Sequence, residues 1–142
     1  MERHASAVWQ GGLKDGKGTL TTDSGVLSKT PYSFAKRFEN EPGTNPEELI
    51  GAAHAGCFTM ALSGQLAERG MVPRQLETRA TVTLDRIDGK PTIAKIHLDL
   101  TATIPNADKA KFEEAAKAAK DGCPVSRLLA PGTKITMDAR LA

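Results

Sequence analysis

The feature that most constrains the fold is a long apolar segment between two strong helix-boundary signals. It begins at Asn45-Pro46-Glu47-Glu48, in which Asn can cap a helix, Pro suits the first helical position and carboxylates favour the positive end. It ends at Gly70, and Pro73 prevents the helix from resuming. The pattern predicts a central helix over residues 46–69, about 36 Å long at about 1.5 Å per residue.

Most of the circumference of this helix is apolar. Between Leu49 and Leu62, only His54, Cys57 and Thr59 carry any polarity. A helix of this kind belongs inside a fold, and the remaining chain is too small to cover every side of it. We therefore expect a second copy of the chain, in a homodimer, to cover the rest. The close approach of a second helix is favoured by a run of small side chains: Gly51, Ala52, Ala53, Ala55, Gly56 and Ala61.

The rest of the chain reads as strands and one further helix. Alternation and glycine-rich turns predict an N-terminal hairpin over residues 3–21, a short strand over 31–38, a long hairpin over 75–104 turning at Asp88-Gly89, a helix over 107–120 and a last strand over 134–141. This order lacks the strict strand–helix alternation of a parallel sheet. We predict one α+β domain spanning residues 1–142.

Composition excludes several classes of protein. No apolar run reaches the roughly 18 residues that a membrane-spanning helix needs, so we expect no membrane association. The net charge is only +2, the charges alternate in sign, and aromatic residues make up 4% of the chain, which argues against a nucleic-acid partner. The N-terminus has no apolar signal-like region, and we expect a cytoplasmic location.

Two cysteines stand far apart in the sequence. Cys57 lies in the middle of the predicted helix, where a lone cysteine is most often a small hydrophobic residue. Cys123 follows Gly122 and precedes Pro124, which places its sulfur at the N-cap of a new helical turn, where amide donors favour a thiolate. A domain of this size in a reducing compartment does not need a disulfide for its stability. If the two thiols pair, we therefore expect the pairing to serve a reaction.

Two cysteine-containing segments carry a family resemblance. Residues 45–49 with 52–58, and residues 122–126, resemble the two motifs of the osmotically inducible protein C (OsmC) family, which includes the organic hydroperoxide resistance proteins. The resemblance extends through residues 25–27 and 34–38. It implies an intertwined α+β homodimer with antiparallel sheets wrapped around central long helices. It also implies a thiol-dependent peroxidase that reduces organic hydroperoxides and, less well, hydrogen peroxide.

The resemblance also assigns roles to residues. It implies that Cys57 is the peroxidatic thiol and Cys123 the resolving thiol, that Arg37 pairs with the reactive thiolate, and that Glu47 holds this arginine. The hydroperoxide-resistance branch of the family carries its arginine in the N-terminal glycine-rich loop, whereas this chain has only lysines there. Arg37 therefore indicates the OsmC branch. The alternative role for Arg37 is a surface ion pair with a nearby glutamate, Glu39 or Glu41.

Elementary chemistry supports a cation beside Cys57. An unaided thiol is mostly protonated at neutral pH, and a guanidinium within about 4–6 Å is the natural source of the missing stabilisation. Glu47 and Cys57 lie ten residues apart on one helix, about 15 Å along its axis, so one arginine does not easily serve both within a chain. Two central helices that cross antiparallel near Gly51–Gly56 would bring Glu47 of one chain toward Cys57 of the other. We expect a site shared between subunits.

The chemistry that the resemblance implies needs no cofactor and no metal. Cys57 would become a sulfenic acid, Cys123 would capture it as a disulfide, and a small dithiol of the lipoyl type would reduce that disulfide. Ile50, Phe58 and Met60 are candidates for an apolar pocket lining that favours organic peroxides.

The competing hypothesis is a binding module. A dimeric domain with inert cysteines could bind a small ligand, or His54, Cys57 and Cys123 could bind a metal with water or His97 in the fourth position. Neither cysteine belongs to a paired metal-binding motif, which argues against the metal site.

Overall fold

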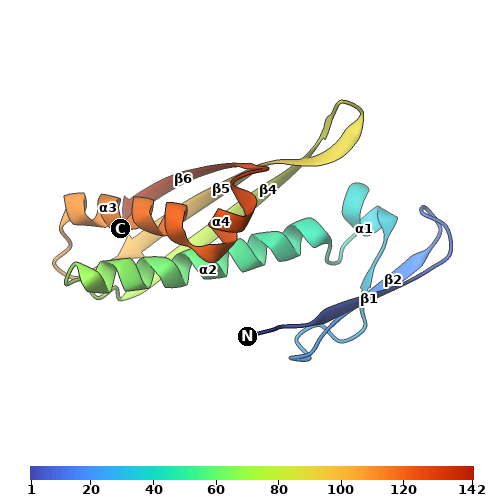
Figure 1. Ribbon diagram of the computed structural model, residues 1–142, viewed down its shortest axis with the longest axis horizontal. Helices are drawn as coiled ribbons and strands as arrows, with labels where there is room; N and C mark the ends of the chain where they lie inside the picture. Colours follow the sequence, from blue (N-terminus) through green and yellow to red (C-terminus); the bar gives the residue numbers. More distant parts are fainter. The chain divides into compact units, whose positions relative to one another are not determined.

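The computed structural model describes residues 1–142 and contains two units, Met1–Leu49 and Ile50–Ala142. Helix α2 (Pro46–Glu68) begins in the first unit and continues through the second (Figure 1). Its start and end agree with the prediction to within one residue. The cap is the predicted one, because Asn45 Oδ1 accepts the Glu48 backbone N–H at 2.8 Å.

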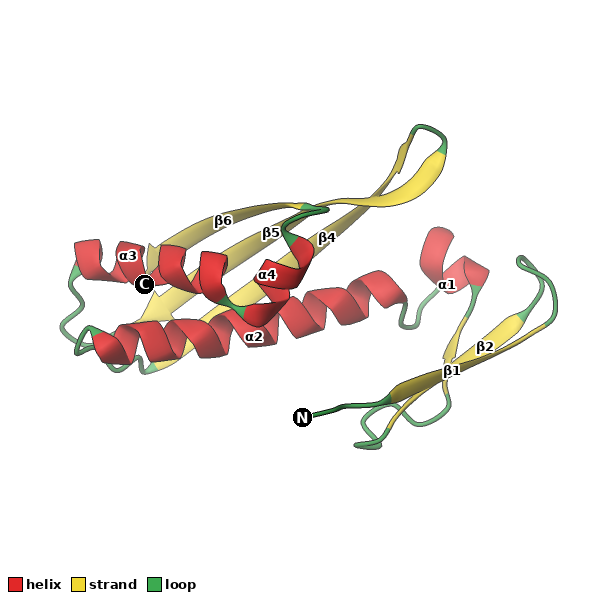
Figure 2. Ribbon diagram, in the orientation of Figure 1, coloured by secondary structure: helices red, strands yellow, loops and turns green.

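The second unit contains a three-stranded sheet. Strands β4 (Gln75–Ile87) and β5 (Lys90–Thr103) form the predicted antiparallel hairpin around Asp88 and Gly89 (Figure 2). Both turn residues have positive φ, 49° and 74°, which a two-residue hairpin turn of this type requires. Strand β6 (Lys134–Leu141) pairs with the other edge of β5 and completes the order β4-β5-β6.

The β5–β6 pair is parallel, which the expectation of antiparallel sheets did not include. Two helices, α3 (Lys109–Gly122) and α4 (Pro124–Leu129), stand between these strands in the chain. They carry the chain back along the sheet, so β6 starts beside Lys95 and runs in the same direction as β5. Such a helical crossover is the usual way to join parallel neighbours.

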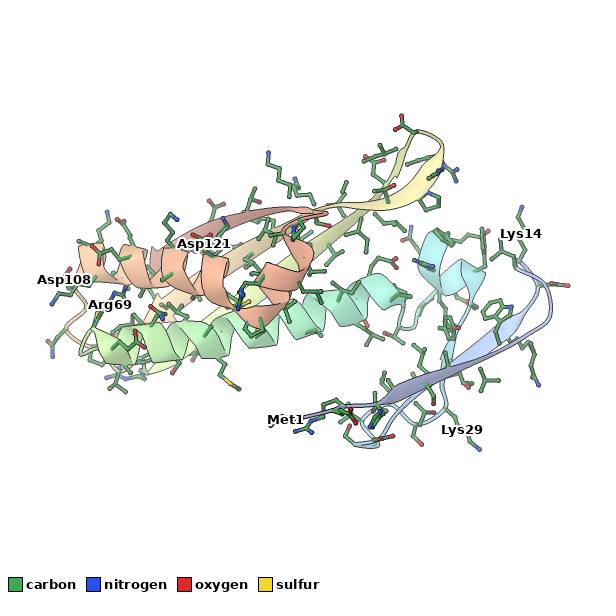
Figure 3. All side chains as sticks on the ribbon, viewed as in Figure 1. Met1, Lys14, Lys29, Arg69, Asp108 and Asp121 are labelled. Carbon is green, nitrogen blue, oxygen red and sulfur yellow. The ribbon has the colours of Figure 1, made fainter.

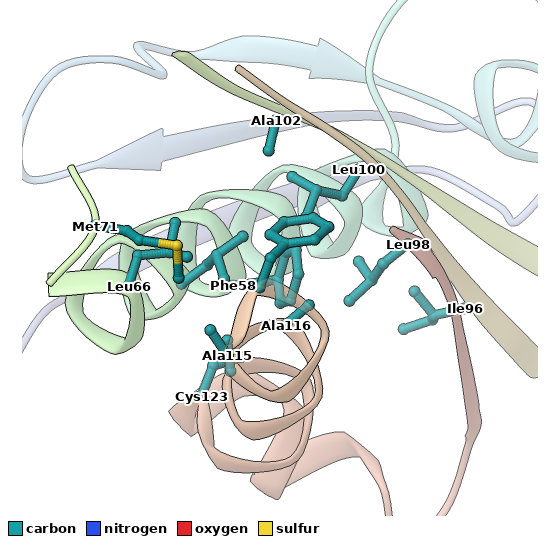
Figure 4. Packing of buried hydrophobic residues seen from close by; sticks show 13 residues of the cluster. Phe58, Leu66, Met71, Ile96, Leu98, Leu100, Ala102, Ala115, Ala116 and Cys123 are labelled. Carbon is teal, nitrogen blue, oxygen red and sulfur yellow. The ribbon is translucent and has the colours of Figure 1, made fainter. Parts of the chain in front are cut away.

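The hydrophobic core lies between the sheet and the helices of the second unit. Along β5, alternate residues are fully buried, as expected for a strand with one covered face. Figure 4 shows these side chains meeting those of α2 and α3. The large members are Phe58, Leu62, Leu66, Ile96, Leu98, Leu100 and Phe112. Charged side chains such as Lys14, Lys29, Asp108 and Asp121 lie on the surface (Figure 3).

The first unit contains a small antiparallel sheet. Strands β1 (Ala5–Gln10), β2 (Lys17–Thr22) and β3 (Thr30–Tyr32) lie in the order β1-β2-β3, and the first two form the predicted hairpin. The rings of Trp9 and Tyr32 lie 5.4 Å apart across β2. The residue between them is Gly18, and a Cβ there would overlap both rings, so the aromatic pair requires glycine.

The predicted strand over residues 31–38 is only partly present. Strand β3 ends at Tyr32, and Phe34–Phe38 form a short helix, α1. Ser33 explains the change, because its hydroxyl accepts the Lys36 backbone N–H at 3.2 Å and so caps a helix. Phe34 and Phe38 then share one helix face, with ring centroids 4.8 Å apart.

The first unit has no buried apolar side chain of its own. Every apolar residue of the core comes from the second unit, and all six residues of β1 are exposed. A three-stranded sheet needs a covered hydrophobic face to be stable. The large exposed apolar side chains of the first unit are Met1, Val8, Trp9, Leu13, Val26 and Phe38.

The cap of α2 gives a direct test of the fold. Replacing Asn45 by Ala removes the acceptor for the Glu48 N–H, and we expect a loss of about 1 kcal/mol in the free energy of unfolding. Asn45→Asp keeps an acceptor and is the matched control, with an expected change of a few tenths of a kcal/mol. Urea unfolding followed by circular dichroism measures both. An Asn45→Ala protein as stable as the Asp variant would contradict the cap.

Candidate active site

The two cysteines come from different elements of the second unit. Cys57 lies on α2 and is partly exposed, whereas Cys123 is fully buried at the start of α4, and both are free thiols. Cys123 is the N-cap residue of α4, as predicted, and its sulfur accepts the Ser126 backbone N–H at 3.3 Å. The Gly122-Cys123-Pro124 sequence therefore fixes the position of this sulfur relative to the helix.

The start of α4 packs against α2 at Cys57. Burial raises the pKa of Cys57 above its ordinary value, the nearby Cys123 thiol raises that pKa further, and the Val125 backbone N–H lowers it. The groups acting on Cys57 thus include one thiol and one amide from the start of α4, two residues apart in the chain. The fold brings together two sulfurs that are far apart in the sequence.

The surroundings of Cys57 disfavour its thiolate form. None of the groups that shift its pKa carries a positive charge. A neutral, partly buried sulfur beside a second thiol is a poor nucleophile, since the thiolate is the reactive form. Reactivity at neutral pH therefore requires a cation.

A buried polar network joins Cys123 to Ser126 and His54. The His54 side chain is fully buried, and its Nε2 is 2.7 Å from the Ser126 hydroxyl. The Cys123 thiol donates to the same hydroxyl at 3.2 Å. Burial lowers the pKa of His54, which keeps the imidazole neutral. Sequence reasoning left the role of His54 open and missed Ser126. The sequence feature that could have identified Ser126 is its position, three residues after the N-cap residue Cys123.

The first unit contains an arginine held by a nearly buried carboxylate. Arg37, on α1, donates from Nη2 and Nε to Glu47 Oε1 at 2.7 and 3.0 Å. The Glu47 side chain is 9% exposed and that of Arg37 38%, so the carboxylate is anchored while part of the guanidinium faces outward. The predicted Arg37–Glu47 pair is present, and Lys36, not Arg37, pairs with Glu41. A guanidinium held in this way can present its remaining N–H groups to an anion.

The metal-binding alternative lacks a ligand set. No three or more His, Cys, Asp or Glu side chains are grouped so that they could hold a metal ion. His54 is hydrogen bonded to Ser126, and His97 bonds Thr136 through Nδ1 at 2.7 Å. His97 also lies 3.3 Å from Asp138, so its two nitrogens are engaged within the β5–β6 pair.

Comparison with known proteins shows the family of the chain. The family model described as OsmC-like protein matches residues 38–138, a span that includes Glu47, Cys57 and Cys123. The chain belongs to the OsmC-like protein family. It is 48% identical to peroxiredoxin OsmC of Escherichia coli strain K12 over 141 residues, which cover 99% of this chain and 97% of the relative. It is 30% identical to the organic hydroperoxide resistance protein OhrB of Bacillus subtilis strain 168, covering 87% of each chain.

Solved structures support the α+β fold of this OsmC-like protein. The crystal structure of Bacillus subtilis OhrB matches with a TM-score of 0.72 and 27% identity, over 96% of this chain and 98% of that one. An OsmC-like protein from Mycoplasma pneumoniae matches with a TM-score of 0.77 at 17% identity, over 100% and 98% of the two chains, and supports the fold alone.

Proposed function

We propose that this OsmC-like protein is a thiol-dependent peroxidase that reduces organic hydroperoxides to alcohols, with Cys57 as the peroxidatic and Cys123 as the resolving cysteine. The protein is an oxidoreductase. The names of its relatives, peroxiredoxin OsmC and organic hydroperoxide resistance protein, support this activity. The observation that carries the assignment of residues is the neighbourhood of Cys57 and Cys123 at the contact of α2 with α4. Hydrogen peroxide is a weaker substrate in this proposal.

The reaction has two thiol steps. The Cys57 thiolate attacks the terminal peroxide oxygen, an S–O bond forms, the O–O bond breaks, and the departing alkoxide takes a proton to leave as an alcohol. Cys57 is now a sulfenic acid. Cys123 attacks its sulfur, an S–S bond forms and water leaves. A small dithiol of the lipoyl type then reduces the disulfide by thiol–disulfide exchange and is itself oxidised.

The first step needs the positive charge that the Cys57 surroundings lack. In the proposal Arg37 supplies it, since its guanidinium is always charged and Glu47 fixes its orientation. The same guanidinium stabilises the developing negative charge on the peroxide oxygens as the O–O bond breaks. Glu47 acts through Arg37 and is a positioning residue.

A homodimer completes the site in this proposal. The outer face of α2 is formed by small residues and Met60, whose side chain is 79% exposed, and a groove runs between this face and the start of β4. The sheet of the first unit likewise has no core of its own. A second copy that packs α2 against α2 in an antiparallel manner would cover these surfaces and bring Arg37 and Glu47 of one chain to Cys57 of the other.

None of the helices has the length and apolar character required to cross a membrane. The proposal places the protein in the cytoplasm, where both thiols are kept reduced between turnovers. It treats residues 1–142 as a single peroxidase domain that works as a dimer.

The roles of the cysteines are tested by titration. One equivalent of cumene hydroperoxide should convert the wild-type chain to a form 2 Da lighter, because the disulfide has lost two hydrogens. Cys123→Ser should instead gain one oxygen, and further oxygens when more equivalents are added, since its sulfenic acid has no resolving thiol. Cys57→Ser should remain unmodified. Intact-mass spectrometry reads all three outcomes, and repeated peroxide turnover by Cys57→Ser would reverse the assignment.

The role of Arg37 is tested by the pH dependence of the peroxide step. Without the guanidinium, burial and Cys123 hold the pKa of Cys57 high, so less thiolate exists at neutral pH. For Arg37→Met we expect a peroxide reaction about tenfold or more slower at pH 7, with its rise shifted by at least about one pH unit to the alkaline side.

Arg86→Met is the matched control for this experiment. Arg86 lies at the exposed end of the β4–β5 hairpin, and its loss should leave the pH profile unchanged. Stopped-flow consumption of cumene hydroperoxide across pH 5–10 measures the profile. An Arg37→Met protein with the wild-type profile would contradict the assignment.

A further inference from the structure

The peroxide chemistry leaves one buried titratable group unused. His54 is fully buried on α2, one helical turn before Cys57. Its Nε2 contacts Ser126 at 2.7 Å, whereas its Nδ1 is buried without any hydrogen-bond partner. A buried polar atom without a partner is destabilising and rare in proteins, so a functional reason for it should be sought.

The network connects this imidazole to the resolving sulfur. Three groups follow one another: the Cys123 thiol, which donates to Ser126 Oγ at 3.2 Å, the Ser126 hydroxyl, and Nε2 of His54. The backbone N–H of Ser126 also points to the Cys123 sulfur, at 3.3 Å. The chain of contacts is buried throughout, since His54, Cys123 and Ser126 are each at most 2% exposed.

We propose that His54 accepts, through the Ser126 hydroxyl, the proton that Cys123 must lose when it attacks the Cys57 sulfenic acid. The inference rests on the proposed function, because it concerns the resolving step of that reaction. His54 does not touch the reacting sulfur and is therefore a positioning residue, whereas Ser126 contacts the sulfur directly.

The hydrogen bonds of the network already run in the direction of this transfer. While Cys123 is a thiol, the S–H donates to Ser126 and the Ser126 O–H donates to Nε2, which leaves the imidazole N–H on Nδ1 with no acceptor. When the sulfur gives up its proton, both hydrogen bonds reverse, so that Nε2–H donates to Ser126 Oγ and the Ser126 O–H donates to the sulfur. Nδ1 keeps its proton throughout.

The surroundings of His54 suit a neutral proton acceptor. Burial lowers the pKa of His54, so the imidazole is unprotonated at neutral pH. Burial is the one cause that shifts this pKa, and no charged group acts on the imidazole. The charged residue of α4, Arg127, is exposed, and the sheet residues that take part in the core are apolar, among them Ala80, Val82, Ile96, Leu98 and Met137.

The step balances as follows. The Cys123 thiol proton passes to Ser126 Oγ as the Ser126 proton passes to Nε2, and the sulfur electron pair forms the S–S bond. The S–O bond of Cys57 breaks, and the leaving hydroxide takes the proton from Nε2 through Ser126 Oγ to become water. The imidazole is then neutral again, with its proton on Nδ1. The net change is sulfenic acid plus thiol to disulfide plus water.

Single-turnover mixing separates the two thiol steps. The full-length protein is mixed with one equivalent of cumene hydroperoxide, quenched with dimedone, which traps sulfenic acid, and analysed by mass. His54→Gln can still hydrogen bond Ser126 but cannot take up a proton, and Ser126→Ala interrupts the relay. Both should consume peroxide within about twofold of the wild-type rate and form the disulfide about tenfold or more slowly at pH 7.

The pH profile distinguishes proton transfer from a structural role. The deficit of both variants should shrink by pH 9, where hydroxide replaces the missing acceptor, and dimedone-trapped sulfenic acid should accumulate only at lower pH. His97→Gln is the matched control, since His97 also bonds a hydroxyl, that of Thr136, outside the site. It should behave as the wild type.

Two results would overturn the relay, and one would overturn the proposed function as well. Disulfide formation by His54→Gln at the wild-type rate, or a deficit equal at every pH, would overturn the relay. Circular dichroism shows whether a variant is folded, and Ser126→Ala gives the same test if His54→Gln is not. If the wild type itself forms no disulfide with the peroxide, the proposed function fails and the relay with it.

Discussion

A thiol that is partly buried beside another thiol resists ionisation, and the account of this protein depends on that constraint. The contact of α2 with α4 is well suited to forming a disulfide, because it brings Cys57 and Cys123 together. The same contact raises the pKa of Cys57 and so works against the attack on peroxide. The proposed peroxidase therefore needs a positive charge besides the groups that act on Cys57.

The distribution of buried residues differs between the two units. The second unit has a complete core between its sheet and its helices, whereas the first unit has a sheet without a core and a charge pair, Arg37–Glu47, anchored by a nearly buried carboxylate. In the proposed dimer the same surfaces that need cover also carry the missing cation. Folding and catalysis would then depend on one interface, as is common where a subunit interface completes a site.

Much of the fold could be predicted from local signals in the sequence. Asn45, Gly70 and Pro73 define α2 because caps and breakers act within one turn, and alternation defines the long hairpin. The short helix α1 was missed because Tyr32 and Phe34, two residues apart, resemble a strand, and the Ser33 cap decides otherwise. The parallel pairing of β6 was missed because strand direction depends on the crossover and not on the strand itself.

The candidate site was predictable to a similar extent and for similar reasons. The sequence motifs identified Cys57, Cys123, Arg37 and Glu47, and the structure shows the two local relationships among them, the thiol pair and the ion pair. Ser126 could not be recognised as a partner of His54, because the two residues meet only through the packing of α4 on α2. Hydrogen bonds between distant segments leave no periodic signal in a sequence.

Mixing two variants that are impaired in different parts of the site tests the shared site most directly. One chain carries Cys57→Ser and keeps Arg37, and the other carries Arg37→Met and keeps Cys57. After unfolding and refolding together, half of the dimers should be mixed, and each mixed dimer should contain one intact site, so about a quarter of the wild-type peroxidase activity should return. If each site were built within a single chain, no mixed dimer could contain an intact one. Activity no greater than the sum of the two separate variants would contradict the account.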